Sequence, residues 1–166
     1  MDILAQTPLT LSLVNAGAVA GTTNSFTTTA ATVPVIQGKF GTALGVLTNS
    51  ATTPTTDANT GLAFPTLAAN QAAAVVFGTN AAGTLKAVQG TIVQTEVGVT
   101  TTVGAFISAP PFPALPDDFC PFAYTLVRVS PTGAAFTLGT TQWAASGITC
   151  STFKNITAMP ARPQVA

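Results

Sequence analysis

The sequence is poor in charge and lacks histidine. Only 6% of its 166 residues are charged, five basic and five acidic, where a typical soluble domain has roughly 25%. Without a basic stripe the chain cannot neutralise a phosphate backbone, which argues against nucleic acid as a direct partner. The absence of histidine removes the commonest general base and metal ligand, and with them every Ser-His or Cys-His nucleophile pair. We therefore expect a protein that is not an enzyme and that carries no cofactor.

No apolar run is long enough to cross a membrane, although the mean hydropathy is positive at +0.50. A spanning helix needs about 20 consecutive apolar residues. The best candidate, residues 9–20, is shorter and is interrupted by Thr10, Asn15 and Gly17. Asp2 precedes it where a secretory signal would carry a basic residue. We expect no membrane partner and no leader.

The few carboxylates do not form a recognisable catalytic or metal site. Asp117 and Asp118 are neighbours in an extended stretch, where adjacent side chains point to opposite sides, so they do not face each other as an acid and base pair. We interpret them as a solvated turn after Pro116, with an enzyme that uses either one as the alternative. No Asp-rich loop with the spacing of calcium ligands is present, so we predict no metal site and no catalytic residue.

Two cysteines, Cys120 and Cys150, are present, and their spacing does not decide whether they pair. We favour free thiols because assembly in a cytosol is reducing. The nearest cation is Lys154, four positions after Cys150, so a buried structural role is favoured over a reactive one. The single tryptophan, Trp143, is read as a core residue, with a ligand-stacking platform as the alternative.

What the chain has in place of charge is Thr, Ser, Asn and Gln, and the branched Cβ of threonine favours strands. Residues 9–13 alternate apolar and polar, which predicts a strand with Leu9, Leu11 and Leu13 on one face. Residues 48–61 hold Thr, Asn, Ser, Asp and Pro with no apolar side chain beyond alanine. This composition predicts an exposed loop.

Two hairpins and a last strand are expected further along the chain. Residues 73–77 and 84–89 flank a stretch of turn residues, which predicts the first hairpin. Residues 123–129 and 134–138 flank Ser-Pro-Thr-Gly, with proline and glycine where a type I turn prefers them, which predicts the second. A final strand is expected over 148–156.

Five prolines fall within the thirteen residues 109–121. Proline fixes φ and has no N–H, so this segment cannot be an internal strand or a helix. We expect extended, polyproline-like chain over a surface, pinned by Phe112, Leu115 and Phe119.

These patterns together predict an all-β protein, since no segment keeps a helical period. We expect a β-sandwich or jelly-roll-like antiparallel domain over residues 38–166, preceded by an extended N-terminal arm over residues 1–37. The arm carries apolar alternation but is broken by Gly17, Gly21 and Pro34. We therefore expect it to contact a neighbouring subunit more than its own domain, by strand addition.

Several segments of the sequence resemble virion proteins of tailed bacteriophages. They are FPALPDDFCPFAYTLVRV at 112–129, FTLGTTQW at 136–143, MPARP at 159–163, the Thr- and Asn-rich loop at 53–61, Asn70-Gln71 and GTLK at 83–86. The resemblance implies a particle component of the head decoration, cement or head-fibre type, and it carries over no functional residues.

The function expected from both readings is a structural component of the phage head. Its partners would be the major capsid protein and further copies of itself in a symmetric oligomer, with a trimer as one option, assembled in the host cytoplasm. A net charge of zero favours association, because near-neutral proteins tend to associate. The alternative is a receptor-binding, tail-fibre or spike module that uses loop 48–61 as its contact surface.

Overall fold

The computed structural model describes residues 9–21, 24–48 and 53–164, and these contain no helix. The predicted all-β class is confirmed. The strands are β1 (Leu11–Ser12), β2 (Val19–Ala20), β3 (Phe26–Thr27), β4 (Pro34–Ile36), β5 (Lys39–Phe40), β6 (Gln71–Thr79), β7 (Leu85–Gln89), β8 (Val93–Gln94), β9 (Cys120–Val129), β10 (Ile148–Cys150) and β11 (Lys154–Asn155).

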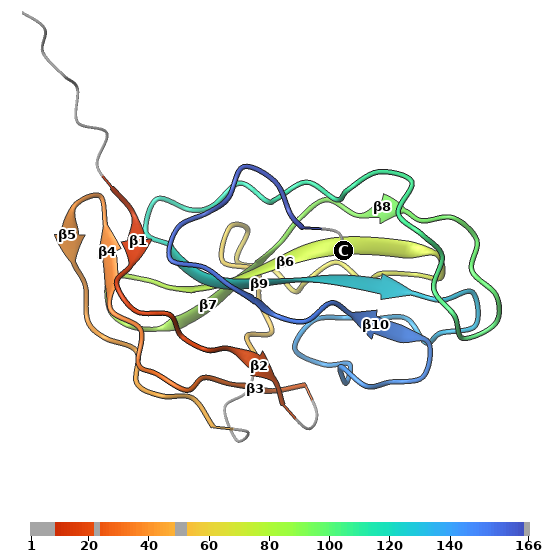
Figure 1. Ribbon diagram of the computed structural model, residues 1–166, viewed down its shortest axis with the longest axis horizontal. Helices are drawn as coiled ribbons and strands as arrows, with labels where there is room; N and C mark the ends of the chain where they lie inside the picture. Colours follow the sequence, from red (N-terminus) through yellow and green to blue (C-terminus); the bar gives the residue numbers. More distant parts are fainter. Residues whose placement is uncertain (1–8, 22–23, 49–52, 165–166) are drawn as a thin grey trace, which may run out of the picture.

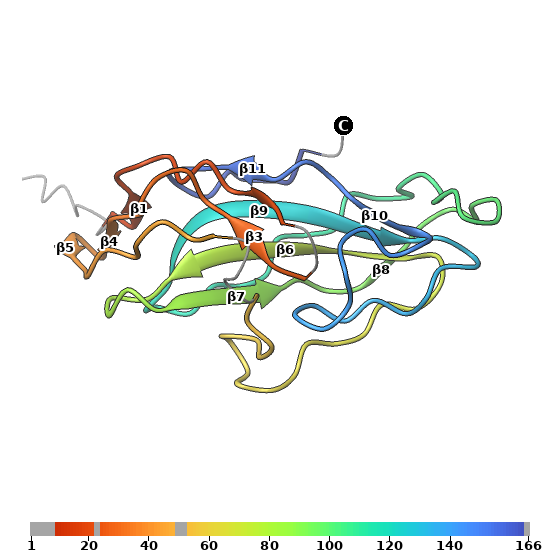
Figure 2. The same cartoon turned by 90° about the horizontal axis from the view of Figure 1, so that it is seen from below.

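A central antiparallel sheet runs along the molecule in the order β10-β9-β6-β7 (Figure 1). Its long strands β6 and β9 are adjacent. Strand β8 pairs with β6 beyond the end of β7, and β11 pairs with β9 beyond the end of β10, so one short strand continues each side of the sheet. A small sheet, β1-β4-β5, lies at one end of the molecule, and β2 pairs with β3 over the central sheet (Figures 1 and 2). This arrangement is consistent with the predicted sandwich.

The hairpin predicted over 73–89 is present as β6 and β7, paired from Val75↔Gln89 to Thr79↔Leu85. Strand β6 continues two residues further than expected, because Gly78 belongs to the strand and not to the turn. A Cβ on Gly78 would lie 2.5 Å from ring carbons of Phe119, so only glycine admits this ring over the strand. The register between β6 and β9 shifts at this point.

Strand β9 contains Pro121, although a proline cannot donate to a ladder. Pro121 pairs with Gly78 beside the register shift, where the regular ladder is interrupted. Bulges are the positions at which a sheet tolerates proline. The extended segment was expected to run to residue 121, but its last two residues, Cys120 and Pro121, belong to β9.

The hairpin predicted over 123–138 is wrong in its second strand. The turn after Ser130 forms, with Gly133 N–H donating to Ser130 O at 3.2 Å. The chain then leaves β9, and Phe136 bridges Leu67. Both sides of β9 are already occupied, by β6 and by β10 with β11, so no side is left for residues 134–138. The final strand expected over 148–156 appears as β10 and β11, which are separated at residues 151–153.

The strand predicted over residues 9–13 is present in short form as β1, which pairs with β4. Its apolar face points outward: Leu9 is 59% and Leu13 50% exposed, while Ser12 is 1% exposed. Ser12 faces inward because its N–H donates to Thr157 O at 2.8 Å, and its hydroxyl donates to Val14 O. The alternation of apolar and polar residues predicts that the leucines share one face, but it does not determine which face of the strand is buried.

Strands β4 and β5 form a tight hairpin with a two-residue turn. Ile36 pairs with Lys39, and the residues between them, Gln37 and Gly38, have φ of 50° and 77°. Two positive φ angles in succession are those of a type I′ turn, whose twist matches the flanking strands. The boundary predicted between residues 37 and 38 falls inside this turn.

One face of the central sheet is covered by aromatic rings. Phe77 on β6 lies 4.8 Å from Phe26 and 5.2 Å from Phe153 between ring centroids. Trp143 packs edge-on to Phe77, and its Nε1 donates to Ser25 O at 2.7 Å, which confirms the prediction that it is a core residue. Phe26 and its neighbours Ala16 and Ala18 belong to this cluster, so the described part of the arm packs on its own domain.

The opposite face carries Val76, Val88, Phe119 and Tyr124. Three further segments pack against them: the proline-rich segment through Phe112 and Leu115, the chain after β11 through Ile156 and Met159, and Ala58. The prediction that residues 109–121 are ordered chain pinned by Phe112, Leu115 and Phe119 is thus confirmed, with Phe119 buried and the other two half-buried.

Candidate functional site

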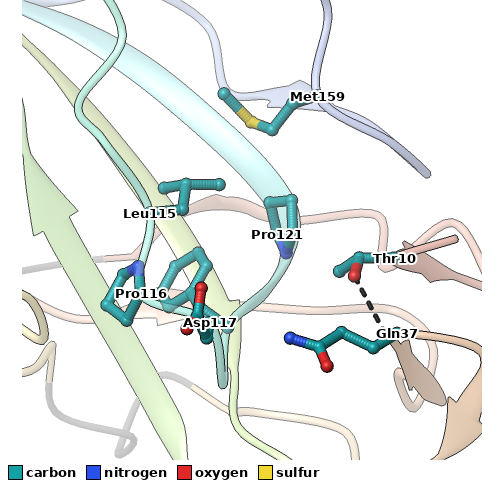
Figure 3. Close-up of a pocket in the computed structure, with 8 residues that line it drawn as sticks. Thr10, Gln37, Leu115, Pro116, Asp117, Pro121 and Met159 are labelled. Atoms are coloured by element: carbon teal, nitrogen blue, oxygen red, sulfur yellow. Dashed lines mark hydrogen bonds between the residues drawn. The ribbon is translucent and has the colours of Figure 1, made fainter. Parts of the chain in front are cut away.

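A cavity of about 290 Å³ lies where the β4–β5 hairpin meets the proline-rich segment. Its lining comes from four stretches far apart in the sequence: Thr10, Gln37, residues 115–121 and Met159 (Figure 3). Leu115, Pro116, Phe119, Pro121 and Met159 make it apolar, and Thr10, Gln37 and Asp117 give it polar groups.

A second cavity of about 270 Å³ adjoins the first, because Gln37 and Asp117 line both. Its other lining residues are Ile36, Lys39, Phe40, Ala81 and Asp118. We call the two cavities together the groove. Each volume lies just below the roughly 300–1,000 Å³ of small-molecule pockets, so each cavity suits a side chain of a peptide better than a cofactor.

Two hydrogen bonds fix the polar groups of the groove. Gln37 N–H donates to Thr10 Oγ1 at 3.1 Å, which joins the β4–β5 turn to the chain entering β1. Ala81 N–H donates to Asp118 Oδ1 at 2.8 Å, which joins the β6–β7 turn to the segment before β9. Asp117 is exposed, and the side chain of Gln37 extends toward it in Figure 3. The interpretation of residues 117–118 as a solvated turn is confirmed.

Large apolar side chains are exposed beside the groove. Phe40, which lines it, is 76% exposed, and Leu9 and Leu13, on either side of strand β1, have half or more of their surface in solvent. Single exposed apolar residues are ordinary, whereas contiguous apolar patches are typical of interaction sites. An apolar floor with hydrogen-bonding groups at its edge can bind an extended chain through side chains and backbone together.

A second group of exposed apolar residues lies at the opposite end of the molecule, on the hairpin formed by residues 95–107 (Figure 1). Val97, Val99 and Ile107 are 79%, 72% and 66% exposed. The hairpin is held by bridges between Thr95 and Phe106 and between Val99 and Thr102.

One cation fixes this hairpin to the sheet. The guanidinium of Arg128 on β9 lies 4.8 Å from the centroid of the Phe106 ring, and its Nη1 donates to Gly104 O at 3.1 Å. An exposed apolar surface on a fixed hairpin loses little conformational entropy when it binds a partner.

Loop 48–61 differs from the exposed loop that its composition predicts. Residues 49–52 lie outside the described residues. Asp57 is 4% exposed, and its carboxylate accepts N–H groups of Asn59 at 2.8 Å, Thr60 at 3.3 Å and Gln89 at 2.9 Å. Ala58 N–H also donates to Ala87 O at 2.9 Å, so the loop covers the outer edge of β7. In the described part of this loop, the exposed residues are Thr48, Thr55, Thr56, Asn59, Thr60 and Gly61.

The short strand β11, on the other side of the central sheet, is joined to the chain before β2 by the side chain of Asn155. Its Oδ1 accepts Ala18 N–H at 2.6 Å, and its Nδ2 donates to Ala18 O at 3.1 Å. Edge strands with free N–H and C=O groups are templates for pairing with another chain. The carboxylate of Asp57 covers part of the edge at β7, and the amide of Asn155 holds the chain that lies beside β11.

The two cysteines are free, as predicted. Cys150 pairs with Val127, seven positions along β9 from Cys120, which corresponds to roughly 23 Å. A disulfide needs Cα atoms within about 7 Å, so the fold holds the thiols apart. Burial raises the pKa of Cys150 to about 12, and burial opposed by a hydrogen bond with the backbone of Val35 raises the pKa of Cys120 to about 11. Both are neutral thiols at neutral pH, which is the opposite of a reactive cysteine.

Within residues 9–21, 24–48 and 53–164, no three His, Cys, Asp or Glu side chains gather as metal ligands do. The same stretches contain no helix with the length and hydropathy of a membrane span. Comparison with protein-family models, with curated proteins and with solved structures finds no match to the chain.

Sequence patterns pointed to part of the groove and missed the rest. The proline-rich segment was expected to be pinned by Leu115 and Phe119, both of which line the groove. Thr10, Gln37 and Met159 carry no local signal, because their contribution depends on contacts between segments more than twenty residues apart. Gly38 is the local sequence feature that favours a tight turn there, because glycine readily adopts the positive φ that the structure shows at this position.

Proposed function

We propose that the protein is a non-enzymatic structural component of a bacteriophage particle, which decorates or cements the capsid as a symmetric oligomer. The observation that carries the proposal is the placement of exposed apolar residues at two opposite ends of the molecule, with Leu9, Leu13 and Phe40 at one end and Val97, Val99 and Ile107 at the other. Two separate ends provide one surface for further copies and one for the shell. Many such modest contacts, repeated over a shell, add up to firm attachment.

The chemistry of the described residues supports a role in assembly. The charged side chains that line the groove are Lys39, Asp117 and Asp118, and the carboxylate of Asp118 accepts a backbone N–H. Cys120 is buried and Cys150 is half-buried, and both thiols are protonated at neutral pH. These groups serve to hold a partner in place, and none of them has the paired arrangement of an acid and a base.

We assign the shell contact to the 95–107 hairpin. The test is cosedimentation of purified protein with purified phage heads that lack it. Val99→Asp puts a charge on a side chain that is 72% exposed, so it should leave the fold intact and reduce head binding at least tenfold. Leu62→Asp makes the same change on a residue that is 69% exposed in the loop beside β7, and it should bind as the unchanged protein does. Equal binding by all three proteins contradicts the assignment.

A receptor-binding or spike module is the second candidate. The observation that favours it is the exposed tip of loop 53–62, whose threonines and asparagine are presented on a base fixed by Asp57. In that case Thr55→Asp together with Asn59→Asp would abolish adsorption to host cells and leave head binding unchanged. Loss of head binding with normal adsorption favours the structural role.

A further inference from the structure

We propose that residues 1–8 of one copy bind in the groove of a second copy, so that an exchanged arm joins the subunits of the oligomer. This deepens the proposed function, on which it rests, by naming the partner of the groove. Residues 1–8 lie outside the described residues, and the inference concerns where their sequence fits.

The root of the arm lies at the groove. Thr10 lines the first cavity, and Leu9 O accepts Gly38 N–H at 2.9 Å, so the chain that precedes Leu9 starts beside the β4–β5 turn. Eight residues in extended form span roughly 26 Å, which is enough to reach an adjoining copy. The reciprocal contact between two copies is self-complementary, as a symmetric interface requires.

The arm sequence, Met-Asp-Ile-Leu-Ala-Gln-Thr-Pro, matches the chemistry of the groove. In an extended chain Asp2 and Leu4 share a face and lie roughly 7 Å apart. Leu4 fits the apolar first cavity formed by Leu115, Phe119 and Met159. Asp2 then reaches the second cavity, whose charged lining residues are Lys39, Asp117 and Asp118, and Lys39 is the one of them that attracts its carboxylate.

The groups between the two cavities suit the backbone of the arm. Gln37 and Asp117, which line both cavities, provide an amide and a carboxylate for its N–H and C=O groups. The carboxylate of Asp118 accepts Ala81 N–H, so it faces the β6–β7 turn as well as the cavity.

A second copy explains more than the arm of the same chain would. Leu9 and Leu13, which flank β1 near the root of the arm, are exposed. An arm that crosses to a neighbour brings the roots of two arms together and covers these leucines. An arm that folds back on its own groove leaves them in solvent.

The experiment measures mass by analytical ultracentrifugation on the full chain and on three variants. Deletion of residues 1–8 removes no described residue, and Leu4→Asp alters only the arm. Both should convert the oligomer to a single chain whose circular dichroism spectrum is unchanged. Leu62→Asp is the matched control and should remain oligomeric, because Leu62 is exposed and lies outside the groove.

Mixing distinguishes exchange from self-binding. Leu115→Asp blocks the first cavity and keeps the arm, whereas the deletion keeps the groove and lacks the arm. Each alone should be a single chain, and their mixture should form a two-chain complex. A synthetic peptide of residues 1–8 should bind the deletion variant and prevent this complex, and the Leu4→Asp peptide should do neither. If Leu115→Asp unfolds, Asp117→Lys, at an exposed groove residue, takes its place.

Two outcomes overturn the inference. An oligomer that survives both arm variants shows that another surface joins the copies, and peptide binding without a mixed complex shows that the arm binds its own groove. Neither measurement uses phage heads. Failure of head binding with the expected masses would therefore refute the proposed function alone.

Discussion

The ring of Phe112 stands edge-on to the ring of Tyr124, with 4.9 Å between centroids and an interplanar angle of 87°. This contact joins the proline-rich segment to the middle of β9. The hydroxyl of Tyr124 accepts Gln164 N–H at 3.0 Å, so the same residue also holds the end of the described chain. One face of the sheet is thus covered by two extended segments that both pack on Tyr124.

Removal of the anchors of the proline-rich segment should destabilise the fold in order of their burial. Phe119 is 2% exposed and covers Gly78, so we expect Phe119→Ala to cost about 3–5 kcal/mol of unfolding free energy. Phe112 is half-buried, so its replacement by alanine should cost about half as much. Thr55→Ala, in an exposed loop position, should change it by less than about 0.5 kcal/mol. Chemical denaturation measures all three, and equal effects would make the segment a linker.

Asp57 should be the most sensitive carboxylate for stability. Its side chain accepts three backbone N–H groups, one of them on β7, and hydrogen bonds to charged groups contribute about 1.5–3 kcal/mol each. We expect Asp57→Ala to reduce the free energy of unfolding by about 2–4 kcal/mol and Asp57→Asn by less, since an amide oxygen still accepts. Asp117→Ala, at an exposed residue, is the control. An Asp57→Ala protein as stable as this control would show that the loop does not depend on the carboxylate.

The hairpin of β6 and β7 was predictable because its alternation, turn residues and partner strand are close in sequence. Local patterns failed where a distant segment decides. Ser12 is buried because Thr157 accepts its N–H, and Asp57 is buried because Gln89, 32 residues away, donates to it. In the groove, Thr10, Gln37 and Met159 meet only after the sheet has formed. Composition and periodicity predicted the all-β class, whereas the residues that line the groove are determined by pairing between distant segments.

The arm was expected to contact a neighbour more than its own domain. Its described part packs on its own domain, and residues 1–8 lie outside the described residues. Phe26 is fully buried against Phe77 and Phe153, so Phe26→Ala should cost about 3–5 kcal/mol and lower the melting temperature of the whole protein. Contact with a neighbour stays a prediction for residues 1–8. A Phe26→Ala protein with an unchanged single melting transition would show that the arm does not share the core.

The buried thiols should make the protein less stable in alkali. Their pKa values are raised from 9.0 to about 11 for Cys120 and about 12 for Cys150, so above pH 9 the unfolded chain loses protons that the folded chain retains. Stability from this source is complete below pH 9 and falls as the pH rises toward 11–12. Each thiol contributes a slope of at most about 1.4 kcal/mol per pH unit. Cys150→Ala should flatten the curve of unfolding free energy between pH 9 and 11, and an unchanged curve would contradict the assignment.

The central claim is that the protein is a stoichiometric part of a phage head. The most direct test is quantitative mass spectrometry of intact heads of a phage whose genome carries this sequence, washed at high salt, with the ratio of this protein to the major capsid protein as the readout. If the protein is a head component, the ratio is fixed, is the same from one preparation to the next and corresponds to a symmetric set of sites on the shell. Absence of the protein from washed heads, or a ratio that varies between preparations, would contradict it.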